Sequence, residues 1–103
     1  MVQSRKTRII RLIDELLKQF HKDKFIFAQL IRHRHVVRNA LSDETIDAEV
    51  SSFEKLNRDR LAIRDTSVFE SSAIAKDVKT VWDSLDQRNR DVLWKWINFI
   101  LHS

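Results

Sequence analysis

The sequence contains no glycine and no proline. Average usage would place about seven glycines and five prolines in a chain of this length. Tight β-hairpins need glycine for their left-handed backbone positions, so a sheet protein without glycine is hard to build. Helices joined by short links of Asn, Asp and Ser do not have this difficulty. The two absences therefore favour an all-helical fold.

The sequence also lacks cysteine. This excludes disulfides and thiolate metal sites, and it favours an intracellular location, in the cytoplasm or the nucleus. No apolar run approaches the roughly 18 residues that cross a bilayer, so we expect no membrane span. The basic start has no long apolar core of the kind found in secretory signals. A mitochondrial presequence is disfavoured because Asp14 and Glu15 interrupt it early.

Charge is unevenly distributed along the 103 residues, a length that predicts a single domain over 1–103. Residues 1–40 contain ten Lys/Arg and three Asp/Glu, whereas residues 41–103 contain nine Lys/Arg and twelve Asp/Glu. The front half of this basic protein therefore has a net charge of +7 and the second half −3, for +4 overall. This asymmetry indicates either an anionic partner for the front half or attraction between the two halves.

Apolar residues recur at helical spacing throughout the chain. The periodicity predicts helices over about 4–20, 23–41, 42–62, 73–85 and 84–102, with a short helical turn starting near Ser67. Ser42 is the expected N-cap of the third helix. Ser67 with Glu70, and Ser84 with Gln87, have capping-box spacing. The pattern predicts a compact bundle of four or five helices.

The last predicted helix is apolar over well over half of its circumference. Such a helix is either central in the bundle or covered by another molecule. Trp94 and Leu101 lie on the side opposite Val92 and Phe99, and one small domain needs only one apolar stripe per helix. We therefore expect Trp94, Leu101 and Ile97 to contact a second chain.

Two arginines of the second predicted helix, Arg34 and Arg38, project into its apolar stripe. They would lie at the same interface or pair with internal carboxylates, and the sequence does not decide between these alternatives.

The sequence offers no catalytic constellation. His33 and His35 are two residues apart, so on a helix they point in different directions and cannot chelate one ion. There is no glycine loop for phosphate, no HExxH motif and no serine in a glycine-flanked nucleophile turn. We expect a non-enzymatic protein with no cofactor, no metal and no small-molecule substrate.

Basic residues near the predicted helix ends suggest an alternative function. Clustered Lys and Arg neutralise phosphates and give sequence-independent binding to nucleic acid. The residues concerned are Arg5, Lys6, Arg8, Arg11, Lys22, Lys24 and Arg32. They would instead be structural if they paired with the acidic second half.

The second half also shows a family resemblance. It contains an RDxxxF segment from Arg64, a W-xx-L pair from Trp82 and an Asn-Arg stretch that leads to LWKWI, and LIDELLKQF precedes them. This pattern resembles that of small uncharacterised helical proteins encoded by large DNA viruses. The resemblance implies a virus-encoded structural or accessory protein and a place in the virion, and it implies no catalytic residues.

From these observations we expect a helical module for protein–protein interaction or assembly, with a protein partner or self-association. Nucleic-acid binding by the basic front half is the alternative.

Overall fold

The computed structural model describes residues 4–72 and 75–102, and within them it contains five α-helices, one 3₁₀ helix and no strand. The elements are α1 (Arg5–Gln19), α2 (Lys24–Asn39), α3 (Asp43–Ala62), η1 (Thr66–Glu70), α4 (Lys76–Trp82) and α5 (Gln87–Leu101). The predicted all-helical bundle is confirmed.

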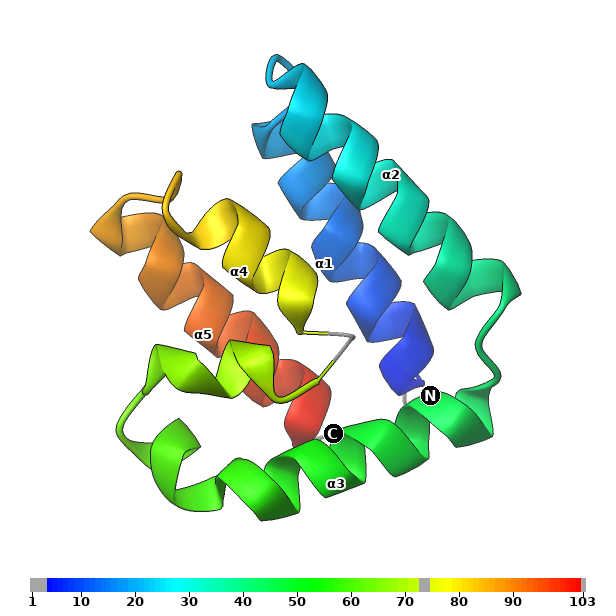
Figure 1. Cartoon of the computed structure of the whole chain (residues 1–103), viewed down its shortest axis with the longest axis vertical. Coiled ribbons are helices and arrows are strands. Elements are labelled where there is room, and N and C mark those ends of the chain that lie inside the picture. Colours follow the sequence, from blue (N-terminus) through cyan, green and yellow to red (C-terminus); the bar gives the residue numbers. More distant parts are fainter. Residues whose placement is uncertain (1–3, 73–74, 103) are drawn as a thin grey trace.

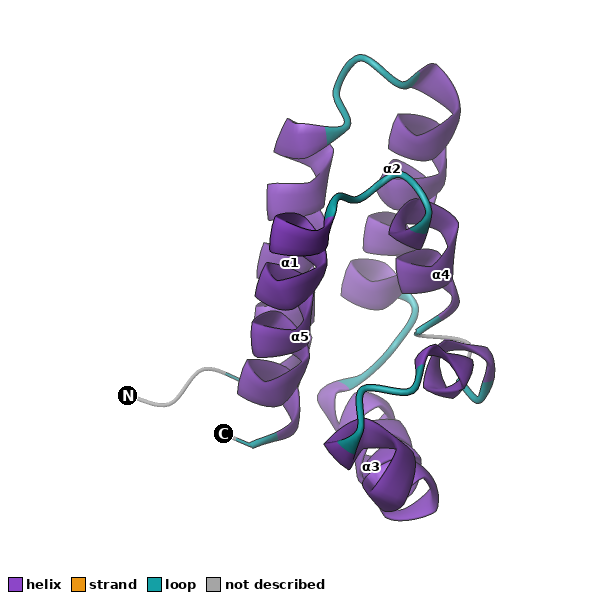
Figure 2. Ribbon diagram, turned by 90° about the vertical axis from the view of Figure 1, so that its left-hand side faces the viewer, coloured by secondary structure: helices purple, strands orange, loops and turns teal. Residues whose placement is uncertain are grey.

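The helices form two layers closed at one end (Figures 1 and 2). Helices α1 and α5 make one layer and run antiparallel, and α2 and α4 make the other. Helix α3 crosses the bottom of both layers, next to η1. This arrangement leaves long outer faces on α2, α3 and α5.

Side chains close the N-termini of five of these elements. Each cap oxygen accepts a backbone N–H from the first turn, at 2.8–3.1 Å, which satisfies a donor that the helix itself leaves unpaired. The capping residues are Ser4, Asp23, Ser42, Asp65 and Asp86. At Asp65 the bond from the Ser67 backbone N–H favours the carboxylate and lowers the pKa of the side chain.

Two of the predicted helix starts were wrong by two residues each. Asp65, and not Ser67, caps the short turn, and Asp86, and not Ser84, caps the last helix. In both cases a carboxylate close to the expected serine reaches the first-turn N–H groups. The fourth helix ends at Trp82, before the expected Leu85, and its expected start at Ala73 lies outside the described residues.

An aromatic cluster joins three elements in the core. The Phe69 ring stacks on Trp94 and packs against Trp82, with both centroid separations at 5.3 Å, and Trp82 meets Trp94 edge-on at 5.8 Å. Such pairs contribute about 0.5–1.5 kcal/mol beyond burial of their area. The cluster fixes η1 and α4 against α5.

Helix α3 ends in a Schellman motif without glycine. The backbone N–H of Asp65 donates to the Arg60 carbonyl at 2.9 Å, and that of Arg64 donates to Leu61 at 3.1 Å. Arg64 has a φ of 55°, the left-handed conformation that glycine normally occupies at this position.

Replacement of Arg64 tests this strain. Because a left-handed L-residue costs about 1–2 kcal/mol, Arg64→Gly should be about 1 kcal/mol more stable than Arg64→Ala in urea unfolding. The alanine variant is the matched control, since both lose the exposed Arg64–Asp91 ion pair, which contributes little. Equal stability of the two variants would contradict the strain.

Candidate functional site

Arginines at the start of α1 bind the carbonyl end of α5. Arg8 Nη1 donates to the Phe99 carbonyl at 3.1 Å, and Arg5 Nη2 donates to the Leu101 carbonyl at 3.4 Å. The Arg8 guanidinium also lies 4.6 Å from the centre of the Phe99 ring, and Arg8 is only 4% exposed. Cations at a helix C-terminus stabilise its unpaired carbonyls and its dipole.

The same use of basic side chains recurs at two other helix ends. Lys6 Nζ donates to the Leu41 carbonyl just after α2, at 2.9 Å. Arg90 donates to the Trp82 carbonyl at the end of α4, at 3.1 and 3.2 Å. Arg5 additionally approaches Asp47 of α3, at 3.9 Å. Much of the basic character of the front half therefore stabilises the fold itself.

Arg8→Ala should lower the free energy of unfolding by about 2 kcal/mol, because it removes a charge-assisted bond from a buried site. Lys22→Ala, at an exposed position, serves as the control and should change stability by no more than about 0.5 kcal/mol. Urea denaturation followed by circular dichroism measures both. If the Arg8 variant were as stable as the Lys22 variant, Arg8 would not stabilise the end of α5.

The seven residues proposed for nucleic acid do not share one role. Arg5, Lys6 and Arg8 contact helix ends, as described above. Arg11, Lys22, Lys24 and Arg32 are exposed, on α1, at the α1–α2 turn and on α2. Among these four exposed residues, only Lys24 and Arg32 share a helix, and we draw the candidate site from that helix.

The structure corrects the predicted interface on the last helix. Trp94 is 5% exposed, and Ile97 and Leu101 are likewise buried in the core of the single chain. The two sides of α5 were distinguished correctly but assigned in reverse, because Val92 and Phe99 are the exposed residues. Trp94 faces inward because Phe69 and Trp82, from other elements, form the pocket that accepts its ring.

Trp94→Ala should therefore destabilise the monomer by about 3–5 kcal/mol, the usual effect of removing a buried Trp side chain. Val92→Thr, at an exposed position on the other side of the same helix, should change stability by about 0.5 kcal/mol or less. Thermal melts of both variants test whether Trp94 belongs to the core or to an interface. A Trp94 variant that melts like the Val92 variant would restore the predicted interface.

The two arginines of α2 have different surroundings. Arg34 Nε donates to the Asp14 carboxylate of α1 at 2.7 Å, so this residue pairs with an internal carboxylate. Arg38 is exposed and lines a hollow of about 350 Å³ on the outer side of α2, together with Ile31, His35 and Asn39. Arg38 thus remains available for a partner.

The outer face of α2 combines exposed apolar and basic side chains. Helix α2 has four Lys/Arg and no Asp or Glu between Lys24 and Asn39. Phe25 is 69% exposed, Ile31 46% and Val36 40%. We define the α2 face by its exposed residues, which are Lys24, Phe25, Ile31, Arg32, His35, Val36 and Arg38. Exposed apolar groups beside charges of one sign are typical of a binding surface.

Residues Phe25 and Val36 were missed by sequence reasoning. Ile31 falls at the apolar spacing of the second helix in the sequence, whereas the structure exposes it. The signal that would have identified the α2 face is the lack of any acidic residue in a helix that has hydrophobic residues on both sides.

A second exposed strip lies on α5. Val92 and Phe99 are its exposed apolar residues, and Val92 and half-buried Trp96 line a groove of about 350 Å³ between α1 and α5. The Phe99 ring already contacts Arg8 on one side and the edge of Trp96 at 5.7 Å. The apolar surface of this strip is therefore partly covered by contacts within the chain, unlike that of the α2 face.

A third exposed strip follows α3. Leu56 is 73% exposed and Ile63, at the helix C-cap, is 75% exposed. Glu49, Ser52 and Asp59 alternate with them at three- and four-residue spacing, so all five share one side of the helix. We call these five residues the α3 stripe. Lys55 and Arg60 are exposed on the same side of the helix, so the α3 stripe lies among charges of both signs, unlike the α2 face.

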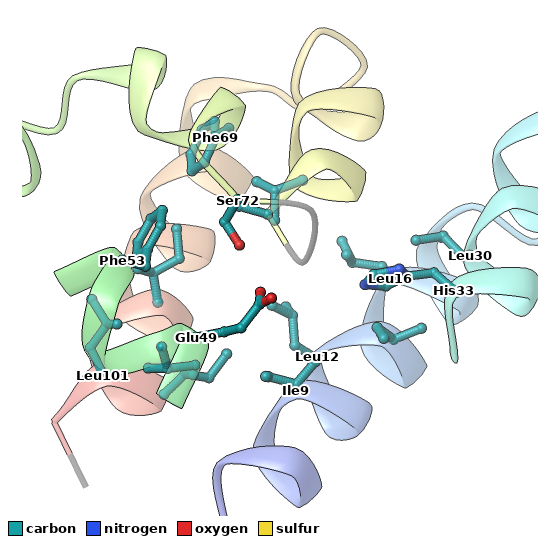
Figure 3. Close-up of a pocket in the computed structure, with 16 residues that line it drawn as sticks. Ile9, Leu12, Leu16, Leu30, His33, Glu49, Phe53, Phe69, Ser72 and Leu101 are labelled. Atoms are coloured by element: carbon teal, nitrogen blue, oxygen red, sulfur yellow. The ribbon is translucent and has the colours of Figure 1, made fainter. Parts of the chain in front are cut away.

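A partly open cavity of about 90 Å³ lies between α1, α2, α3, η1, α4 and α5 (Figure 3). Most of its walls are apolar, and Figure 3 shows the side chains of Glu49 and Ser72 pointing towards each other across it, with His33 approaching from α2. Metabolite-binding pockets usually measure about 300–1,000 Å³. The cavity is therefore a gap in packing of a size that does not accommodate such a ligand.

In the part of the chain that the structure describes, no group of three or more His, Asp or Glu side chains is placed to hold a metal ion. None of the helices described is both long enough and apolar enough to traverse a bilayer.

Comparison of the chain with known proteins identifies no relative. No protein-family model, no curated protein and no solved structure matches it.

Proposed function

We propose that this chain is a non-enzymatic helical module that binds a protein partner through the α2 face. The observation that carries the proposal is the exposure of Phe25, Ile31 and Val36 on a helix that has four cations and no carboxylate. Apolar anchors surrounded by charge of one sign give both affinity and selection of an oppositely charged partner. The proposed partner surface is acidic and apolar.

The resemblance noted in the sequence would make such a module a virus-encoded structural or accessory protein. Assembly and accessory roles both require a surface of this kind, and neither requires catalytic residues.

Nucleic acid is the second candidate, because the α2 face also has the positive charge that phosphates require. A nucleic-acid surface, however, gains little from Phe25 and Val36, and only three exposed cations lie beside them, namely Lys24, Arg32 and Arg38. A protein partner uses both the apolar and the charged groups.

Site-specific photo-crosslinking tests the protein-partner proposal. A photoreactive phenylalanine at position 25 should yield a crosslinked protein adduct, because this side chain lies within the proposed contact. The same group at Lys95, exposed on α5, is the matched control and should not give that adduct. Adding Arg32→Glu and Arg38→Glu should reduce the adduct at least about tenfold. Equal adducts from both positions would contradict the proposal.

Fluorescence anisotropy with labelled duplex DNA and single-stranded RNA tests the alternative. We expect no binding at physiological salt. Sequence-independent, strongly salt-dependent binding that is lost in Arg32→Glu/Arg38→Glu would instead assign the α2 face to nucleic acid.

A further inference from the structure

We propose that the hollow on the outer side of α2 binds a phosphate monoester attached to an apolar group, which the protein partner carries as a phosphorylated side chain. This inference rests on the proposed function and names the group of the partner that the α2 face recognises. The α2 hollow is lined by Ile31, Arg34, His35, Arg38 and Asn39.

Two guanidinium groups line the α2 hollow. Arg34 and Arg38 are four residues apart, so their side chains lie on the same side of the helix. Arg38 is exposed and has no hydrogen bond or ion pair among the described residues. Guanidinium groups donate paired N–H groups in a planar arrangement that matches phosphate oxygens. Arg38 is therefore the main phosphate-binding side chain in this proposal.

Arg34 is held in place by Asp14 of α1. Its Nε donates to the Asp14 carboxylate at 2.7 Å, and its two Nη groups have no other partner among the described residues. The N–H groups on the Nη atoms are thus left for a phosphate. The Asp14 charge and the carbonyl end of α2 both oppose an anion. We therefore expect weak binding, with a dissociation constant on the order of 1 mM.

A hydrogen bond from Asn39 determines which donor His35 presents. Asn39 Nδ2 donates to the His35 backbone carbonyl at 3.2 Å, and this fixes the orientation of the amide because a carbonyl oxygen only accepts. The same Nδ2 lies 3.1 Å from His35 Nδ1, so Nδ1 is the acceptor and the neutral ring has its proton on Nε2. His35 therefore adds an N–H donor to a hollow whose lining contains no carboxylate.

Ile31 gives the α2 hollow an apolar wall. This side chain is 46% exposed in the single chain. The hollow has a volume of about 350 Å³, at the lower end of the range for sites that bind small organic ligands. A bare phosphate ion would leave Ile31 in water, whereas a phosphate attached to an apolar group would cover it. The hollow therefore favours an ester over the free ion.

The donors of the α2 hollow also favour a monoester over a carboxylate. A phosphate monoester has a charge of about −1.5 to −2 at neutral pH and three strong acceptor oxygens. A carboxylate has one charge and two oxygens. The N–H groups of Arg34, His35 and Arg38 can bond to all three phosphate oxygens.

Titration of the ¹⁵N-labelled chain with phenyl phosphate at a fixed pH of about 8, followed by NMR, tests the site. We expect chemical-shift changes concentrated around residues 31–39. Arg38→Gln should weaken binding at least about tenfold, because it removes charge-assisted hydrogen bonds. Lys24→Gln is the matched control, since it removes the same charge from the same helix about 21 Å away. It should change the dissociation constant by less than about twofold.

Comparison with inorganic phosphate tests the apolar wall. Phenyl phosphate should bind at least about threefold more tightly than inorganic phosphate, because its ring covers Ile31. Ile31→Ser should remove this difference and leave the affinity for inorganic phosphate nearly unchanged. Circular dichroism melts establish that all variants are folded.

Two results would overturn the inference. The first is the absence of shifts around the hollow with phenyl phosphate at about 20 mM, well above the expected dissociation constant. The second is a Lys24→Gln variant that weakens binding as much as Arg38→Gln, because charge along the whole helix would then be responsible, as in nucleic-acid binding.

Photo-crosslinking from position 25 distinguishes this inference from the proposed function. Treatment of the partner with a phosphatase should reduce the adduct at least about tenfold. An adduct formed by a chain that does not bind phenyl phosphate would refute the inference and leave the proposed function intact. An adduct that resists phosphatase, from a chain that does bind phenyl phosphate, would assign the hollow to a free phosphate ester. The absence of any adduct would refute the proposed function and the phosphorylated partner together.

Discussion

A chain without glycine or proline must still satisfy the unpaired N–H and carbonyl groups at the ends of five helices, and this constraint underlies much of the structure. Serine and aspartate oxygens cap the N-termini of four of these helices and of η1. Basic side chains satisfy carbonyls at the ends of three helices, and a strained arginine replaces the usual glycine at the end of a fourth. The basic side chains at the carbonyl ends link helices to one another, whereas serine, aspartate and glycine caps are local.

This constraint explains the uneven charge of the sequence. The basic residues at the start of α1 lie beside the carbonyl end of α5, where their charge compensates a helix dipole. Arg34 is neutralised by Asp14 of the neighbouring helix. The charge left for a partner is therefore smaller than the sequence total and is located on the outer side of α2.

The fold followed from the sequence because helical periodicity and capping residues are local signals. Ser42 capped its helix as expected, since a cap needs only its own first turn. Which side of α5 is buried, in contrast, is not determined by local sequence. Both of its sides are hydrophobic, and the choice of Trp94 over Val92 depended on rings from two distant segments. The α2 face was not predicted, for the same reason. Whether Phe25 is exposed depends on which elements pack against α2.

The contact between Arg5 and Leu101 has a consequence for how the protein is made. Helices α1 and α5 form one layer, so α1 packs against the last helix as well as against its neighbour in sequence, α2 (Figure 2). Contacts of such large sequence separation slow folding, because a long loop must close before they form. During synthesis α2 can cover part of α1 early, whereas the side of α1 that packs against α5 stays uncovered until α5 has been made. Completion of the α1–α5 layer is thus coupled to completion of the last helix.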